Sequence, residues 1–226
     1  MKKAFLLFVL FSLLGCTLQY EGEERLVVTG KLIDKYNNPI QSNNVEVWIH
    51  MNEQQGGIYP SGGDQDLISF TQTDANGNFR MLFPKPINED EIELKFYDKD
   101  NIYQNKSYIN IKKSNFIDYT FTANTITLYK KEDITLLKVI LNNVNPANQI
   151  ERISLIGQTA ESLFWVNPLE NNENFYYYDS YFHEVAKNQT LIMEYDVKDF
   201  ATQQITTLQQ TINIGTDNET EFTLDY

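Results

Sequence analysis

Apolar and polar residues alternate along most of the chain after residue 24, and turn-forming residues separate the alternating segments at short spacing. A period of two places successive side chains on opposite faces of a strand, so this pattern predicts strands and no helix. The 14 Tyr and 14 Phe residues support the same interpretation, because aromatic side chains suit a pleated surface. The sequence therefore predicts an all-β protein built from two tandem β-sandwiches.

Turns divide the first half into short strands. Asn37, Asn38 and Pro39 form one predicted turn, and the run from Asp74 to Gly77 forms a hairpin turn. The glycine-rich segment 52–63 is expected to be a long polar loop. The predicted strands of this half are 25–34, 45–51, 66–73, 79–83, 92–96, 108–112 and 126–129.

A second run of strands follows the charged segment 130–133, where we place the domain boundary. Its strands are predicted at 134–141, 152–156, 163–166, 175–185, 190–197, 204–214 and 221–224. That number suits an immunoglobulin-like or fibronectin-like sandwich. The expected domains are thus residues 25–131 and 132–226.

The first of these two units carries a family resemblance. The segments VTGKLIDKYNNPI, NVEVWI and FTQTDANGNFRM resemble, in this order, the carboxypeptidase regulatory-like domain, a transthyretin-like β-sandwich of about seven strands. Asn38 stands where that family usually has glycine, and we expect the turn to survive because asparagine tolerates positive φ. The matching positions are Gly30, Asp34, Pro39, Ile40, Val45, Val47, Thr73, Asp74, Gly77 and Phe79.

The first 15 residues have the features of a signal peptide. Lys2 and Lys3 precede an apolar run, residues 4–14, which is too short to span a hydrocarbon core that needs roughly 20 helical residues. The residues Leu-Leu-Gly-Cys at 13–16 resemble the lipobox of bacterial lipoproteins, in which the cysteine becomes the lipidated first residue of the mature chain. The resemblance implies lipid on Cys16, with residues 16–24 as a lipidated tether and each buried methylene contributing about 0.8 kcal/mol to membrane binding.

The residue after Cys16 and the net charge of the chain predict the localisation and the partners. By resemblance to the lipoproteins of didermal bacteria, an aspartate at position 17 would retain the protein at the inner membrane. Thr17 stands there instead, so the resemblance implies the outer membrane, with the protein facing the periplasm or the outside. Loss of Lys2 and Lys3 with the leader changes the net charge from −13 to −15. A surface this acidic repels nucleic acid and anionic lipid, so we expect no nucleic-acid partner and membrane attachment only through Cys16.

The sequence offers no strong catalytic or metal-binding pattern. His50 and His183, the two histidines, have no second histidine or cysteine at ligand spacing, and the chain contains no Gly-x-Ser-x-Gly elbow. We therefore predict no enzyme activity, no metal and no cofactor. A weaker alternative is an unfamiliar enzyme that uses Asp64, Asp66 and His50 beside the long loop.

Two aromatic features indicate binding. Trp48 falls on the strand face opposite Val45, Val47, Ile49 and Met51, where it is either covered by the glycine-rich loop or offered to a ligand. The run from Phe175 to Phe182 places aromatic side chains on both faces of a predicted strand. It either packs against the first domain or forms a stacking platform.

We predict an adhesion, scaffold or accessory binding subunit of the envelope. The alternative is a carbohydrate-binding module of a glycan-uptake system that uses Trp48, Tyr176, Tyr178 and Tyr181, so the expected partner is a protein or a glycan.

Overall fold

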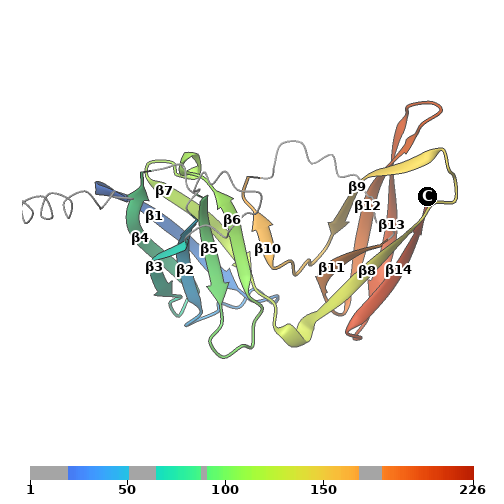
Figure 1. The fold of residues 1–226 in the computed structure, drawn as a ribbon. Coiled ribbons are helices and arrows are strands. Elements are labelled where there is room, and N and C mark those ends of the chain that lie inside the picture. Colours follow the sequence, from blue (N-terminus) through green and yellow to red (C-terminus); the bar gives the residue numbers. More distant parts are fainter. Residues whose placement is uncertain (1–19, 51–64, 88–90, 168–179) are drawn as a thin grey trace, which may run out of the picture.

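The computed structural model describes residues 20–50, 65–87, 91–167 and 180–226 (Figure 1). This part of the chain is built from strands, with 3₁₀ turns at Lys113–Asn115 and Lys131–Asp133, which confirms the predicted all-β class. None of its helical turns has the length and apolar character needed to cross a membrane. The strands are β1 (Tyr20–Ile33), β2 (Asn44–His50), β3 (Gln65–Gln72), β4 (Asn78–Pro86), β5 (Glu91–Tyr97), β6 (Lys106–Ile111), β7 (Thr120–Thr127), β8 (Ile134–Asn142), β9 (Asn148–Ile156), β10 (Leu163–Trp165), β11 (Ser180–Ala186), β12 (Gln189–Asp199), β13 (Ile205–Ile214) and β14 (Glu219–Asp225).

The first sandwich packs a three-stranded sheet, in the order β4-β1-β7, against a five-stranded sheet, in the order β10-β6-β5-β2-β3. Both sheets send alternate side chains inward, as the period of two predicts. Rings in this core meet edge to face, as Phe79 and Phe96 do with centroids 5.6 Å apart. The buried core includes Val28, Leu32, Val45, Val47, Ile49, Phe79, Met81, Phe83, Ile92, Leu94, Phe96, Ile111 and Ile126.

The second sandwich pairs two three-stranded sheets, in the orders β11-β8-β14 and β13-β12-β9. Its core is smaller and mostly aliphatic. In both sandwiches a parallel pair, β1 with β7 and β8 with β14, joins strands that lie far apart in the sequence. The buried residues of this core are Leu137, Val139, Leu141, Ile150, Val185, Leu191, Met193, Tyr195, Val197, Ile212, Ile214 and Leu224.

Two turns of the first sandwich share one design. The carboxylate of Asp34 accepts backbone N–H bonds from Tyr36 and Asn38, both at 2.8 Å, and that of Asp74 does the same with residues two and four positions later. The positive φ falls on Asn37, at 66°, and on the equivalent Gly77, at 77°. The expectation that Asn38 would take the positive φ is therefore wrong by one residue, although the turn is kept.

Strand β1 begins inside the segment expected to be a flexible tether. Tyr20 already pairs with Pro86 of β4, and its hydroxyl donates to Oδ2 of Asp66 at 2.7 Å. Glu24 forms an ion pair with Lys85. Residues 20–24 are therefore part of the sandwich, because they have partners on the neighbouring strands that their acidic composition did not reveal, and residues 16–19 lie outside the described part.

The segment 158–167, which we name the strap, connects the two sandwiches. Its first half bonds to β11, where the Ala160 N–H donates to the Glu184 carbonyl at 2.7 Å. Its second half contains β10, which pairs in parallel with β6 of the first sandwich. The strand at 163–165 was predicted, but we expected it in the second sandwich. Its partner strand depends on a long-range pairing that local alternation does not specify.

Candidate binding site

Trp48 lies on the outer face of the five-stranded sheet, as predicted. Val45, Val47 and Ile49 on the same strand have no measurable exposure, whereas Trp48 is partly exposed on the other side. The alternation of side chains along a strand accounts for this difference in exposure between Trp48 and its neighbours on β2. The prediction that the alternate residues of β2 form one core face and one polar face is confirmed for residues 45–50.

The indole of Trp48 is held by polar neighbours. Its Nε1 donates to Oε2 of Glu46 at 2.7 Å, and the hydroxyl of Tyr97 donates to the other oxygen of the same carboxylate at 2.8 Å. The Nζ of Lys95 lies 4.5 Å from the ring centroid, which is cation–π distance. The bond to Glu46, which Tyr97 holds in turn, and the contact with Lys95 restrain the indole, so Trp48 is positioned before a ligand binds.

Glu93 forms the polar centre of this face. Although it is only 7% exposed, its Oε2 lies 2.6 Å from Nε2 of His50 and 3.3 Å from Nζ of Lys95, and it also accepts a hydrogen bond from Ser107. Burial by itself raises the pKa of the Glu93 carboxyl, but the bonds from Ser107 and His50 and the charge of Lys95 outweigh it and lower the pKa. The carboxylate is thus kept ionised by His50, Lys95 and Ser107.

The same cluster contains the residue types of a serine-hydrolase triad in the wrong arrangement. In such a triad the histidine lies between the serine, whose proton it accepts, and the carboxylate. Here the carboxylate of Glu93 lies between them, because Ser107 and His50 both hydrogen-bond to it. Ser107 therefore donates its proton to an acceptor that is only weakly basic, and this geometry does not activate it as a nucleophile.

Trp165, which sequence reasoning did not select, lies on the same outer face. Phe164 stacks on Tyr108 with ring centroids 4.6 Å apart, and Tyr108 in turn packs against the core. The neighbouring residues Leu163 and Trp165 must therefore point outward, where they are 56% and 46% exposed. Residues 163–166 are all apolar, so the sequence indicated neither which of these side chains face outward nor which sheet the strand joins.

Strand register places the two tryptophans in one line across the sheet, which we name the indole row. Trp48 pairs with Glu93, and Trp165 pairs with Ile109. On β6, the register shift between the pairs Ile92–Ile111 and Leu94–Tyr108 leaves Glu93 facing the two residues Ile109 and Asn110. Three steps between neighbouring strands, each about 4.8 Å, separate the two tryptophan backbones by roughly 14 Å. The row continues to Leu67 on β3, so the face has apolar ends and a charged middle.

An asparagine cluster fixes the end of β10 that follows Trp165. Asn110 has a φ of 56° at the register shift, where β6 carries one extra residue. The Asn167 side-chain amide donates to the Asn110 carbonyl and to Oδ1 of Asn115, both at 2.7 Å. These bonds join the strap to the first sandwich beside the indole row.

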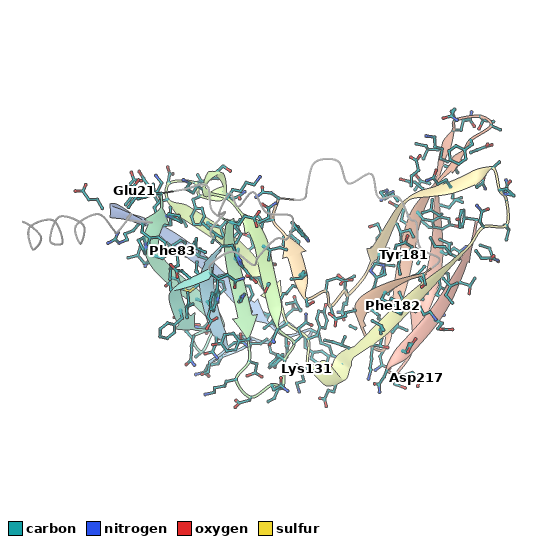
Figure 2. The ribbon with its side chains drawn as sticks, viewed as in Figure 1. Glu21, Phe83, Lys131, Tyr181, Phe182 and Asp217 are labelled. Carbon is teal, nitrogen blue, oxygen red and sulfur yellow. The ribbon has the colours of Figure 1, made fainter. Side chains whose placement is uncertain are left out.

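The predicted aromatic platform does not combine with Trp48 in the described part of the chain. Tyr181 and Phe182 lie on β11 of the second sandwich (Figure 2), and Tyr181 packs against the core there. Phe182 is 55% exposed. Tyr176 and Tyr178 lie outside the described residues. Among the described residues, Trp48 and Tyr181 therefore belong to different sandwiches.

The acidic candidate Asp66, and also Asp98, have structural roles in the sheet and in a turn. Asp66 accepts from Tyr20 and pairs with Ile49, so it faces away from His50, and Asp64 lies outside the described residues. Asp98 accepts the N–H groups of Asp100 and Ile102, as expected of a structural turn. Within the described ranges, no three His, Cys, Asp or Glu side chains lie close enough together to hold a metal ion.

A cavity of about 350 Å³ lies where the strap meets β8, with Gln104, Ser162 and Glu184 among its lining residues. Burial and the nearby charge of Glu161 raise the pKa of the Glu184 carboxyl. The side-chain amide of Gln104 bonds to backbone groups on both sides. Its Nε2 donates to the Ala160 carbonyl at 2.9 Å, and its Oε1 accepts from the Tyr129 N–H at 3.3 Å. The Gln104 amide therefore serves the junction between the sandwiches.

Comparison with known proteins assigns no family. No family model matches the chain. No curated protein matches it either. Among solved structures, the chain is similar to a 9R-lipoxygenase from Cyanothece PCC8801, with 22% identity over 55% of this chain and 20% of the lipoxygenase and a TM-score of 0.30. It is also similar to 3-chlorocatechol 1,2-dioxygenase from Rhodococcus opacus 1CP, with 12% identity, coverage of 50% and 62%, and a TM-score of 0.31.

A shaft pilin from Lactobacillus rhamnosus GG matches over more of the chain, with 9% identity over 89% of this chain and 97% of the pilin and a TM-score of 0.29. The chain spans only a fifth of the lipoxygenase and 62% of the dioxygenase. At TM-scores this low, none of these proteins provides an activity, ligand or partner for the chain.

Proposed function

We propose that this chain is a non-enzymatic binding subunit of the bacterial cell envelope, anchored in the outer membrane by lipid on Cys16, and that it holds its partner on the outer face of the five-stranded sheet. The observation that carries the proposal is the indole row. Trp48 and Trp165 lie on one solvent-facing sheet surface with the partnered carboxylate of Glu93 between them. Tryptophan is enriched at binding surfaces because it is both apolar and able to form hydrogen bonds.

The polar cluster supports binding rather than catalysis. Each of Glu46 and Glu93 already accepts hydrogen bonds from neighbouring side chains, and the order Ser107–Glu93–His50 gives no activated nucleophile. Preorganised groups of this kind orient a ligand at little entropic cost. A broad panel of peptide, ester and glycoside substrates should therefore give no turnover. Turnover that disappears in both Ser107→Ala and His50→Ala would overturn the non-enzymatic role.

The lipid anchor has a direct test. Cells that express the full chain are grown with radiolabelled palmitate, and the product is compared with the Cys16→Ser variant, which keeps the size of the residue but lacks the thiol. We expect label in the wild-type protein only and the wild type in the outer-membrane fraction. Label in both proteins, or in neither, would contradict the proposed anchorage.

The binding face is tested in the envelope itself. A photo-reactive side chain is placed at Leu163, on the exposed outer face of β10, or at Ile192, which is 38% exposed on the second sandwich and serves as the matched control. We expect a discrete adduct from position 163 and none from position 192. Equal adducts at both positions would show that the five-stranded sheet is not the preferred surface.

A further inference from the structure

We infer that the indole row binds a neutral glycan chain laid across the strands from Trp48 to Trp165. The inference rests on the proposed binding function and specifies its ligand class. Trp48 and Trp165 are the two tryptophans of the chain, and both lie on the same sheet face. Ile109 and Glu93 lie between them in the row.

The charged middle of the row argues against a protein partner seated there. The centres of protein interfaces are depleted of charged residues and are usually apolar. In the indole row the ionised Glu93, with Lys95 and His50 bonded to it, lies together with Ile109 between the two indoles. A pyranose ring has the complementary distribution, since its C–H faces stack on aromatic rings and its hydroxyls both donate and accept hydrogen bonds.

The balance of charge selects a neutral sugar over a charged one. The Lys95 ammonium is committed to Glu93 and to the Trp48 ring, and Glu46 adds a second negative charge beside the indole. The whole chain has a net charge of −13, so an anionic glycan would be repelled. Hydroxyls can share the carboxylate and ammonium groups without requiring a free counter-charge.

The separation of the tryptophans indicates a chain rather than a single sugar. Three interstrand steps of about 4.8 Å place the two tryptophan backbones roughly 14 Å apart. A monosaccharide spans a fraction of this distance, whereas several linked sugars cover it. The row ends at β3 and β10, the two edge strands of the sheet, so a chain can extend beyond it across either edge.

The strap completes this site. Trp165 reaches the first sandwich only because β10 pairs with β6 and because Asn167 bonds to Asn110 and Asn115. A glycan that contacts both tryptophans should therefore also stabilise the docking of the strap.

The two tryptophans allow a direct test with single-tryptophan variants. Trp48→Phe leaves Trp165 as the fluorescent reporter, and Trp165→Phe leaves Trp48. The purified chain without its leader is titrated with cellohexaose, xylohexaose and maltohexaose, and with the disaccharides cellobiose, xylobiose and maltose. We expect at least one hexasaccharide to change the emission of both reporters, and its disaccharide to act on one reporter or to bind at least tenfold more weakly.

Calorimetry with alanine variants measures the contribution of each ring. Trp48→Ala and Trp165→Ala should each weaken hexasaccharide binding by about tenfold or more, the usual cost of removing a central aromatic contact. Phe200→Ala is the matched control, because Phe200 is 50% exposed on the second sandwich and should leave affinity unchanged. Circular dichroism and melting curves establish that each variant is folded.

The glycan inference is overturned if no oligosaccharide of the panel binds at millimolar concentration, or if affinity survives both alanine substitutions. That outcome is separable from failure of the proposed function. A photo-adduct at position 163 without glycan binding would leave a binding subunit with another partner. Absence of both would remove the proposed function as well.

Discussion

Each sandwich has one sheet whose outer face carries a charged cluster, and the two clusters differ in their surroundings. The sheets are β10-β6-β5-β2-β3 in the first sandwich and β13-β12-β9 in the second. Each cluster lies in the middle of its solvent-facing sheet. On the second face Arg152 bonds to Asp196 at 2.7 Å and to Glu194 at 2.8 Å, with 41% of its side chain exposed. On the first face only 9% of the Glu93 side chain is exposed, and tryptophans lie on both sides of it in the indole row.

This difference in exposure indicates that the Arg152 cluster is a solubilising surface and that the Glu93 cluster is preorganised for binding. An exposed ion pair is screened by water and salt and contributes little to stability. A shielded carboxylate costs desolvation energy, which the fold offsets with bonds from His50, Lys95 and Ser107. We interpret the shielded Glu93 carboxylate, which lies beside two indoles, as part of a binding site. We interpret the Arg152 cluster as ordinary solvent-exposed surface.

The largest expected effect tests whether the two sandwiches are also separate in stability. Phe96 is completely buried in the first core, and Phe96→Ala should lower the free energy of unfolding by about 3–5 kcal/mol. The measurement is denaturant unfolding followed by tryptophan fluorescence, which reports on the first sandwich, and by circular dichroism, which reports on both.

Leu191→Ala in the second core is the counterpart of this change. If the strap couples the sandwiches into one cooperative unit, both variants shift a single transition seen by both probes. If each variant moves only its own transition, the sandwiches unfold independently and the strap contributes little.

The next effect concerns Glu93. Glu93→Gln removes the charge that pairs with Lys95 and His50 and should cost about 1.5–3 kcal/mol, the range for hydrogen bonds to a charged group. Because the pKa of Glu93 is lowered on folding, its contribution is fully present above the ordinary glutamate pKa of about 4.3 and is lost as the pH falls through the lower folded-state value.

Unfolding curves measured from pH 7 down to pH 2 check this sign. The difference in stability between wild type and Glu93→Gln should shrink in acid, below the ordinary glutamate pKa. A difference that grows on acidification would mean that Glu93 is protonated in the folded protein, contrary to its proposed ionised state.

A smaller and local effect is expected at the strap. Asn167→Ala removes the side-chain bonds to Asn110 and Asn115, each worth about 1 kcal/mol. Amide exchange should accelerate in β10 and in the paired residues of β6, while the core strands β2 and β5 stay protected. Uniform acceleration across the first sandwich would instead show that Asn167 supports the whole fold.

The smallest effect is expected at the Arg152 cluster. Arg152→Gln should leave the melting midpoint nearly unchanged at physiological salt, because the guanidinium is substantially exposed. The pKa of Glu194 and that of Asp196 are both lowered by hydrogen bonds from Arg152, so NMR titration should show both pKa values rising towards their ordinary values in this variant. A loss of stability as large as that of Glu93→Gln would remove the distinction between the two faces.

Much of the fold could be predicted from the chain alone. Alternation at β2 assigned Val45, Val47 and Ile49 to the core and left Trp48 outside, and the turn chemistry at Asp34 and Asp74 placed the reversals correctly. These features are local, because strand period and side-chain-to-backbone bonds act over only a few residues. The all-β class and Trp48 as a candidate follow from them.

The partners of Trp48 were not predictable in the same way. The pairing of β10 with β6 and of Trp48 with Glu93 joins positions far apart in the chain, and alternation gives a strand's two faces without saying which sheet it enters. The acidic composition of residues 20–24 predicts a tether for the same reason, since Asp66 and Lys85, the partners of Tyr20 and Glu24, are distant in sequence. The sequence by itself determined the strands, the turns and the acidic surface. Only the tertiary structure decided that both tryptophans share one face, because long-range register aligns side chains that no local pattern connects.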